Sequence, residues 1–341
     1  MRASLFIALL VALSITAVAL AGPSGYHVAR SYKIGGEGGW DYLMVDSKAR
    51  RVYISRGTHV MVVDADSGAV VGDIPNTNGV HGIAIAAEFG KGFISDGRDN
   101  NVTIFDPTTL KVLGTVATGK NPDAIIYDPG SKRVFTFNGA SKDATAIDAQ
   151  AGTVAGTIAL GGKPEAAASD GKGHVFVNIE DTSEIAEFDS NKLSVEHRWK
   201  IAPGEEPSGL AFDQKNRRLF SVCSNKLMVV LNADNGQVVT TVPIGAGSDG
   251  AAFDPETGLA FSTNGGDGNL TVVHEDSPSK FSVLENVPTL RRARTIALDP
   301  KTHSIYTITA EFGPAPAPTT EQPRPRAPMV AGSFTLLVLS R

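Results

Sequence analysis

One phrase recurs along this chain at intervals of about 42 residues. It consists of a hydrophobic run that ends in Asp, a short polar turn, and a second hydrophobic run that again ends in Asp. A fixed period of this length is typical of stacked or radial repeat units, so it constrains the fold more than any other feature of the sequence. The first Asp of the phrase falls at Asp46, Asp128, Asp170, Asp213, Asp254 and Asp299, with Ala86 in the same register. The second Asp falls at Asp64, Asp106, Asp148 and Asp189, and the series continues at Asn232, His274 and Ser340.

A single unit contains four short β-type runs. In residues 121–163 these runs read DAIIYD, RVFTFN, DATAID and TVAGTIAL, and they are separated by the turn segments DPGSK, GASK and AQAG. Gly, Asp and Ser favour the tight turns that join antiparallel strands. Four antiparallel strands in about 42 residues is the size of one propeller blade. The sequence therefore predicts an all-β fold built from four-stranded antiparallel blades.

Seven units can be counted, but the last one lacks a fourth strand. Its third strand ends at Ser340, and only Arg341 follows. The segment HVARSYKIGG (27–36) matches the fourth-strand segment TVAGTIALGG (153–162) in length, turn glycines and apolar spacing. We therefore predict a seven-bladed β-propeller in which residues 27–34 complete the last blade and close the ring, because closure removes open sheet edges. The units begin near Trp40, Val80, Asn121, Pro164, Pro207, Asp249 and Ala293.

The first 21 residues have the pattern of a secretory signal peptide. Arg2 provides a positive charge, residues 5–20 are an apolar run, and residues 19–21 have the small-residue form of a cleavage site. The alternative is an uncleaved membrane anchor, for which the Ala-rich run is short. We expect cleavage after Ala21, a periplasmic or secreted protein without a stable membrane anchor after processing, and a single domain over residues 22–341.

The net charge and the cysteine content argue against a nucleic-acid partner and against two kinds of cofactor site. A formal net charge of −5 argues against a general nucleic-acid binder, which usually carries a basic face, so we expect no nucleic-acid partner. We also expect a monomer. The single cysteine, Cys223, lies in the apolar run LFSVCS, which is typical of a packed and unreactive thiol. Because the sequence has no C-x-x-C-H motif and no second cysteine, it has neither a covalent c-type haem nor a paired-cysteine zinc site.

Four repeated phrases carry a resemblance to a known family. They read YDPGSKRVF, FDQKNRRLF, FDPETGLAF and LDPKTHSIY, and each is followed by a strand that ends in Asp or a substitute. With these phrases the chain resembles the YVTN/YncE-like seven-bladed propellers over nearly all of residues 22–341. The resemblance implies an exported bacterial propeller. It does not imply one activity, because propellers carry many functions and each must be argued from a site.

The spacing also predicts a ring of polar side chains at one mouth of the propeller channel. The residue five positions before each first Asp is expected to line the channel where the loops entering the inner strands converge. A ring rich in carboxylates suits a divalent cation bound through oxygen, or a cationic or polyhydroxy ligand. A ring that is only the water-lined entrance of a channel is the alternative. We expect Arg294 to pair with Asp41 or Asp249. The ring comprises Asp41, His81, Asp123, Glu165, Ser208, Asp249 and Arg294, of which Asp41, Asp123, Glu165 and Asp249 are the candidate metal ligands.

The seventh unit carries a long Pro-rich loop at residues 313–332. Asp299 and Ser340 are 41 positions apart, whereas the equivalent residues Asp128 and Asp148 are only 20 apart. Proline-rich segments are extended and semi-rigid, and this one is placed on the face of the ring. Long loops in compact domains are often functional, so we expect either a lid or docking arm whose Arg324 and Arg326 reach the ring, or a solvated insertion.

Two functions remain open. The first is a non-catalytic binding module that holds a small molecule or a protein at the channel mouth, which fits the absence of any recognisable nucleophile–base motif. The second is a metal-dependent hydrolase or lyase, by analogy with lactonase-like and lyase-like propellers. In that case His81 is the first choice for a general base, since it is the only imidazole in the ring.

Overall fold

The computed structural model describes residues 23–319 and 325–341, so the predicted signal peptide at residues 1–21 lies outside the described residues. Within this part the regular structure is almost entirely β-strand, which confirms the all-β prediction. The exceptions are two single-turn 3-10 helices, η1 (Ala87–Phe89) and η2 (Glu180–Thr182). None of the described helices is long and apolar enough to cross a membrane.

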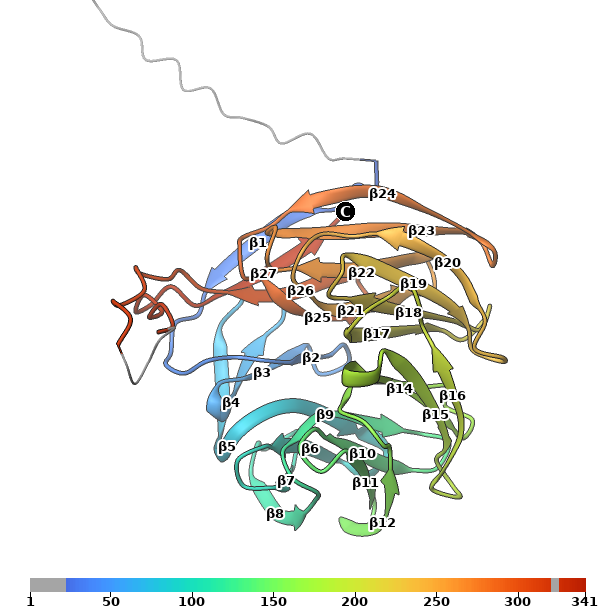
Figure 1. The fold of residues 1–341 in the computed structure, drawn as a ribbon. Helices are drawn as coiled ribbons and strands as arrows, with labels where there is room; N and C mark the ends of the chain where they lie inside the picture. Colours follow the sequence, from blue (N-terminus) through green and yellow to red (C-terminus); the bar gives the residue numbers. More distant parts are fainter. Residues whose placement is uncertain (1–22, 320–324) are drawn as a thin grey trace, which may run out of the picture.

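The described strands form six antiparallel sheets, which follow one another in chain order around the molecule (Figure 1). Five sheets have four strands and one has seven. The seven-stranded sheet contains β2 (Leu43–Asp46), β3 (Arg51–Ser55), β4 (Gly57–Asp64), β5 (Val70–Ala86), β6 (Lys91–Asp96), β7 (Asn101–Phe105) and β8 (Val112–Ala117). The next two sheets contain β9 (Pro122–Asp128), β10 (Arg133–Asn138), β11 (Asp143–Asp148) and β12 (Thr153–Ala159), and then β13 (Pro164–Ser169), β14 (His174–Ile179), β15 (Glu184–Asp189) and β16 (Ser194–Lys200). Two more contain β17 (Pro207–Asp213), β18 (Arg218–Cys223), β19 (Leu227–Asn232) and β20 (Val238–Pro243), and then β21 (Ser248–Asp254), β22 (Leu259–Asn264), β23 (Asn269–Ser277) and β24 (Lys280–Pro288). The last sheet contains β25 (Arg294–Asp299), β26 (Ser304–Thr309), β27 (Thr335–Ser340) and β1 (His27–Lys33).

The seven-stranded sheet differs from the predicted pattern of separate four-stranded units. Its long strand β5 pairs with β4 mainly through residues 70–75 and with β6 through residues 80–86. The segment between these two parts stays extended, although Asn76 and Gly79 both have positive φ angles. One continuous strand therefore serves as the fourth strand of the first predicted unit and the first strand of the second.

Strand β1, from the N-terminal side of the chain, is the outer strand beside the C-terminal strand β27. The pairing runs from His27 opposite Ser340 to Lys33 opposite Thr335. Just before β1, Tyr26 is buried and its hydroxyl donates a hydrogen bond to the carbonyl oxygen of His303 at 2.7 Å. The last sheet thus contains both ends of the described chain.

The recurring Asp residues terminate strands by capping turns. The carboxylate of Asp46 accepts the backbone N–H groups of Lys48 and Ala49, both at 2.9 Å. Asp106 does the same for Thr108 and Thr109 at 2.7 and 3.0 Å. An Asp side chain that accepts N–H groups two and three residues later stabilises a tight turn, which is the physical reason for the repeated phrase.

The core consists of buried clusters between neighbouring sheets. In one cluster Phe135 and Phe137 from β10 pack with Val175 and Val177 from β14. Another cluster joins the first and last sheets, since Val52 of β3 lies in it with Leu336 of β27. The prediction that Cys223 is packed in the interior is confirmed, because its side chain is buried. Burial also raises the pKa of its thiol to about 11.

The innermost strands surround a central cavity of about 200 Å³. Strands β2, β5, β9, β13, β17, β21 and β25 each contact the next in this order, and β25 contacts β2. The cavity is lined by residues such as Tyr42, Gly82, Ala124 and Ile296. The inner strands therefore bring equivalent positions of successive units to one opening.

Candidate functional site

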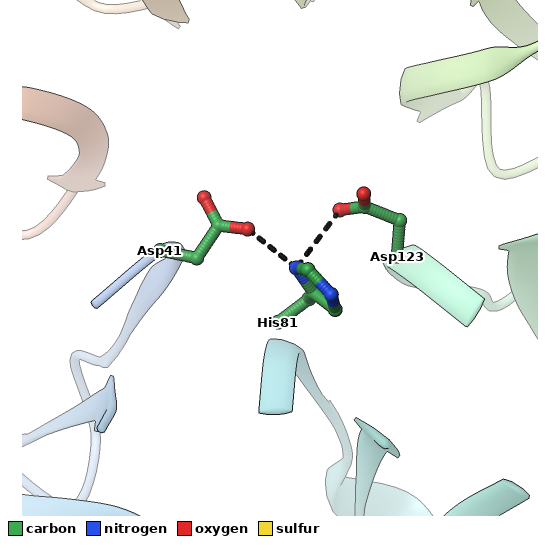
Figure 2. Close-up of side chains that lie close together, drawn as sticks. All are labelled: Asp41, His81 and Asp123. Carbon is green, nitrogen blue, oxygen red and sulfur yellow. Dashed lines mark hydrogen bonds and ion pairs between the residues drawn. The ribbon is translucent and has the colours of Figure 1, made fainter. Parts of the chain in front are cut away.

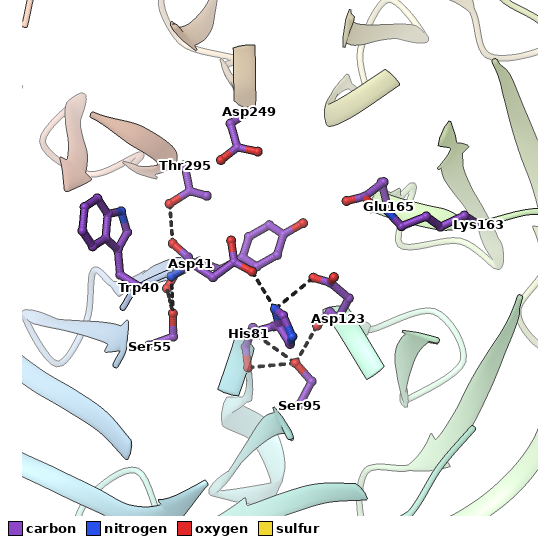
Figure 3. Close-up of polar contacts among 12 residues, drawn as sticks. Trp40, Asp41, Ser55, His81, Ser95, Asp123, Lys163, Glu165, Asp249 and Thr295 are labelled. Atoms are coloured by element: carbon purple, nitrogen blue, oxygen red, sulfur yellow. Dashed lines mark hydrogen bonds and ion pairs between the residues drawn. The ribbon is translucent and has the colours of Figure 1, made fainter. Parts of the chain in front are cut away.

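The predicted ring residues lie near the start of the inner strands and share one end of the cavity. Figure 3 shows side chains from several of these strands around the opening. The positions are Asp41 two residues before β2, His81 in the second part of β5, Asp123 in β9, Glu165 in β13, Ser208 in β17, Asp249 in β21 and Arg294 at the start of β25.

Three of these residues are in direct contact. The Nδ1 atom of His81 lies 2.7 Å from Oδ2 of Asp41 and 3.5 Å from Oδ1 of Asp123 (Figure 2). One ligand atom from each of the three residues lies within 4.8 Å of the other two. All three side chains are mostly buried, with 17 to 27% of each side chain exposed.

Hydroxyl groups of adjacent strands hold the backbone at these positions. The backbone N–H of Asp41 donates to Oγ of Ser55 at 2.8 Å, and the hydroxyl of Thr295 donates to the carbonyl oxygen of Asp41 at 2.6 Å. The hydroxyl of Ser95 donates to the carbonyl oxygen of Asp123 at 2.5 Å. These bonds, seen in Figure 3, fix the backbone that carries each carboxylate.

The surroundings shift the acid–base properties of this group. Burial alone would lower the pKa of His81, but the hydrogen bond to Asp41 and the charge of Asp123 raise it above its usual value. Burial raises the pKa of Asp123 to about 6, although His81 opposes this shift. The shifted pKa values of His81 and Asp123, two groups in contact, make this pair a candidate for a site that binds or transfers charge.

Glu165 belongs to a separate group. The ammonium of Lys163 lies 2.7 Å from Oε1 of Glu165 and also donates to Glu180. Burial and the nearby charge of Asp123 raise the pKa of Glu165 to about 8, while Lys163 opposes this shift. Through this contact Glu180 lies beside Glu165, whereas the neighbouring Asp181 pairs with Lys142 at 2.7 Å.

Arg294 pairs with both of the carboxylates that the sequence suggested. Its Nη1 atom lies 3.1 Å from Oδ2 of Asp249 and 3.6 Å from Oδ1 of Asp41, and its Nη2 donates to the carbonyl oxygen of Trp40 at 2.6 Å. Burial raises the pKa of Asp249, and Arg294 opposes this effect. The hydroxyl of Ser208 instead donates a hydrogen bond to a backbone group, the carbonyl oxygen of Ser248, at 3.1 Å.

A second and larger pocket, of about 880 Å³, lies beside the ring under the Pro-rich loop, and we call it the mouth pocket. Residues 312 and 329 form an isolated bridge at the base of the loop. Loop residues line this pocket together with ring residues Asp249 and Arg294, which places the loop next to the ring. Arg326 lines this pocket, and the other predicted loop arginine, Arg324, lies outside the described residues. The mouth pocket is lined by Asp249, Arg292 and Arg294, by the rings of Trp40 and Phe312, by Gly39, Gly247, Ser248, Gly265 and Gly266, and by Ala315, Pro325, Arg326 and Ala327 of the loop.

The four carboxylates of the ring do not converge on one possible metal site. In the described residues, the cluster that could hold a metal ion contains Asp41, His81 and Asp123, without Glu165 or Asp249. The latter two are paired with Lys163 and Arg294. Sequence reasoning missed Lys163 because it lies two positions outside the ring register, although its place at the same turn was a usable signal.

The comparisons with known proteins address the fold. No family model matches the chain, and no curated protein matches it in sequence. Among solved structures, a chain of hydrazine synthase from Kuenenia stuttgartiensis aligns with a TM-score of 0.70 and 14% identity, covering 80% of this chain and 93% of that one. A chain of a mitotic checkpoint complex aligns with a TM-score of 0.76 and 16% identity, covering 100% of this chain and 99% of that one. Both neighbours are β-propellers, and the likeness shows that this chain has a β-propeller fold.

Proposed function

We propose that the protein is an exported, seven-bladed propeller of the YVTN/YncE-like type that binds a small molecule at the mouth of its channel. Seven inner strands in cyclic contact support the blade count, with β5 counted in both the first and the second blade. The pairing of β1 with β27 supports closure of the ring by the N-terminal strand. The intact mass of the exported protein tests the signal peptide, since cleavage after Ala21 leaves Gly22 as the first residue.

The mouth pocket is the observation that carries this function. Its volume of about 880 Å³ lies in the range of small-molecule sites, roughly 300 to 1,000 Å³. It joins ring residues Asp249 and Arg294 to loop residues Ala315 and Arg326. The neighbour from the mitotic checkpoint complex belongs to a protein assembly, but a concave pocket of this size favours a small molecule over a protein surface at this site.

A thermal-melting scan against a library of small metabolites tests the proposal. A ligand that binds only the folded protein stabilises it by about 2.7 kcal/mol at a concentration 100 times Kd. Ala315→Phe is expected to fill the pocket and abolish the shift, because Ala315 lines it. Ala317→Phe is the matched control, since Ala317 is exposed in the same loop and does not line the pocket. Shifts that survive Ala315→Phe would place binding elsewhere.

The contact between Asp41, His81 and Asp123 favours a second candidate, a metal-dependent hydrolase or lyase. One imidazole and two carboxylates suit Zn²⁺ or Mn²⁺ and leave positions for water and substrate. The present spacing of 2.7 Å between His81 and Asp41 is that of a hydrogen bond, so a metal would have to displace the shared proton. Calorimetric titration with Zn²⁺ and Mn²⁺ tests this candidate, and Asp123→Asn is expected to weaken binding. If wild type and Asp123→Asn give the same isotherm, this candidate is wrong.

A further inference from the structure

We propose that the mouth pocket takes a planar small molecule that carries an oxyanion, either a carboxylate or a phosphate. This inference rests on the proposed function and specifies the class of ligand.

The pocket is locally positive on an acidic protein. Three arginines, Arg292, Arg294 and Arg326, line it with a single carboxylate, Asp249, which leaves a formal excess of two positive charges. The whole chain has a net charge of −5. Asp249 lies 3.1 Å from Arg294, so its negative charge is already paired with a positive charge of the pocket wall. The carboxylates that favour a cation, Asp41 and Asp123, do not line this pocket.

Two of the three guanidinium groups have no carboxylate partner in the described part of the chain. Arg292 and Arg326 are exposed and take part in no ion pair there, whereas Arg294 pairs with Asp249 and Asp41. The guanidinium carbon of Arg292 lies 3.9 Å from the ring centroid of Phe312. Stacking on an aromatic face fixes the plane of the guanidinium and leaves its N–H groups free to bind an anion with two parallel hydrogen bonds.

The rest of the wall is suited to a flat ligand. The rings of Trp40 and Phe312 have centroids 6.0 Å apart and are tilted by 40°, and Phe312 is anchored by its bridge to Met329. Another part of the wall is formed by Gly39, Gly247, Gly265 and Gly266, which carry no side chains and present bare backbone. Aromatic rings and bare backbone present smooth surfaces, against which a planar group packs well.

Trp40 also provides a local signal for the experiment. The chain has two tryptophans, and the other, Trp199, packs on Phe176 in the sheet of β13–β16 and does not line the pocket. In a Trp199→Phe background, fluorescence therefore reports on Trp40. We would titrate this protein with benzoate, phenyl phosphate and the neutral isostere benzamide. The charge variant is Arg292→Gln/Arg326→Gln, and the matched control is Arg291→Gln, an exposed neighbour outside the pocket.

The inference predicts saturable quenching or enhancement by benzoate or phenyl phosphate and a much weaker response to benzamide. Loss of each charged hydrogen bond is worth roughly a tenfold change in Kd, so the double variant should bind at least tenfold more weakly than Arg291→Gln. The tighter of the two anions identifies carboxylate or phosphate as the preferred group. A melting curve of the double variant establishes that it is folded, as expected for exposed residues.

Two results would overturn the inference and leave the proposed function standing. One is equal binding of benzamide and benzoate that persists in the double variant, which indicates a pocket that does not recognise charge. The other is no response to either anion while the metabolite scan gives hits that Ala315→Phe abolishes. If neither anion binds and the scan gives no such hit, the inference and the proposed function both fail.

Discussion

The Nδ1 atom of His81 lies 2.7 Å from Oδ2 of Asp41, although 40 positions of sequence separate the two residues. They occupy the same register position in consecutive units; Asp41 lies two residues before β2 and His81 lies in β5, and these two inner strands are in contact. The repeat therefore creates a side-chain pair that neither local sequence suggests. Its acid–base behaviour is the most direct test of the site.

Asp41→Asn is expected to lower the pKa of His81. The wild-type pKa is raised because the Asp41 hydrogen bond and the Asp123 charge outweigh burial. Stability from this raised pKa is fully present below about pH 6.5, the ordinary value, and is lost as pH rises through the pKa of the folded state. The variant should therefore be destabilised by roughly 1.5 kcal/mol near pH 5.5 and much less near pH 9.

Histidine NMR titration and melting curves at the two pH values measure these effects. The matched control is Asp276→Asn, because Asp276 lies at the same distance of 2.7 Å from Nδ1 of a different histidine, His274. This control should leave the His81 titration unchanged. A His81 pKa that does not move in Asp41→Asn would show that the contact does not persist in solution.

A buried carboxyl near the ring, that of Asp96, leads to a second pH effect, in which stability also falls as pH rises. Asp96 is 1% exposed, its Oδ1 has no hydrogen-bond partner, and burial raises its pKa to about 7 although Thr103 donates to it. Between about pH 4 and 7 the folded state binds a proton that the unfolded state lacks, so stability falls as pH rises through this window. Asp96→Asn should remove this slope and stabilise the protein above pH 7, by at most about 4 kcal/mol.

Chemical denaturation at several pH values measures the slope. The variant and the wild type should be most alike near pH 4, where the wild-type carboxyl is protonated. An unchanged slope in Asp96→Asn would mean that another group causes it.

The period of the sequence predicts where backbone positions meet, and the ring shows this clearly. Asp41, His81 and Asp123 could be placed at one opening because each precedes a repeated Asp by five positions, or in the case of His81 the Ala86 that replaces it. The pairing of Arg294 was also predictable, since only a few carboxylates share its ring. The repeat does not determine which neighbouring side chain each ring residue contacts. The separate pairs His81–Asp41, Lys163–Glu165 and Arg294–Asp249 are therefore known only from the structure.

Features outside the register were not predictable in the same way. Lys163 lies beside a ring position and neutralises Glu165, which the ring spacing does not reveal. The continuous strand β5 replaces two predicted strands because the segment between its halves stays extended. The mouth pocket depends on where Phe312 and the long loop pack, and packing of an aperiodic segment does not follow from a repeat.

A third prediction concerns ring closure by the N-terminal segment. Removing residues 22–36 should strongly lower the melting temperature, because it deletes β1 from the last sheet and leaves β27 as an open edge. Point variants at Tyr26, which is 1% exposed and packs edge-on to Phe261 at 5.1 Å, give a finer test. Tyr26→Ala should cost about 3–5 kcal/mol, and Tyr26→Phe, which loses only the bond to His303, about 1 kcal/mol.

Melting curves of the three variants measure this series. The order expected is deletion, then Tyr26→Ala, then Tyr26→Phe, from the lowest melting temperature to the highest. A deletion variant that melts like the wild type would show that the N-terminal strand does not close the propeller.

The last prediction is that the Pro-rich loop contributes to ligand binding but little to the stability of the fold. At the base of the loop, Gly313 N–H donates to the carbonyl oxygen of Pro328 at 2.9 Å, and Val330 N–H donates to that of Glu311 at 2.8 Å. These bonds hold the loop ends independently of the residues between them. Replacing residues 314–327 with a Gly/Ser segment of equal length should therefore change the melting temperature little, because most of these residues that the structure describes are exposed.

The same replacement should abolish binding at the mouth pocket, because it removes Pro325 and Arg326 from the wall and replaces a semi-rigid segment with a flexible one. Melting curves and the Trp40 fluorescence titration measure the two properties on one protein. A variant that keeps both its stability and its ligand affinity would show that the loop is a solvated insertion. A variant that loses stability instead would show that the loop supports the fold, and binding would then have to be tested with Ala315→Phe alone.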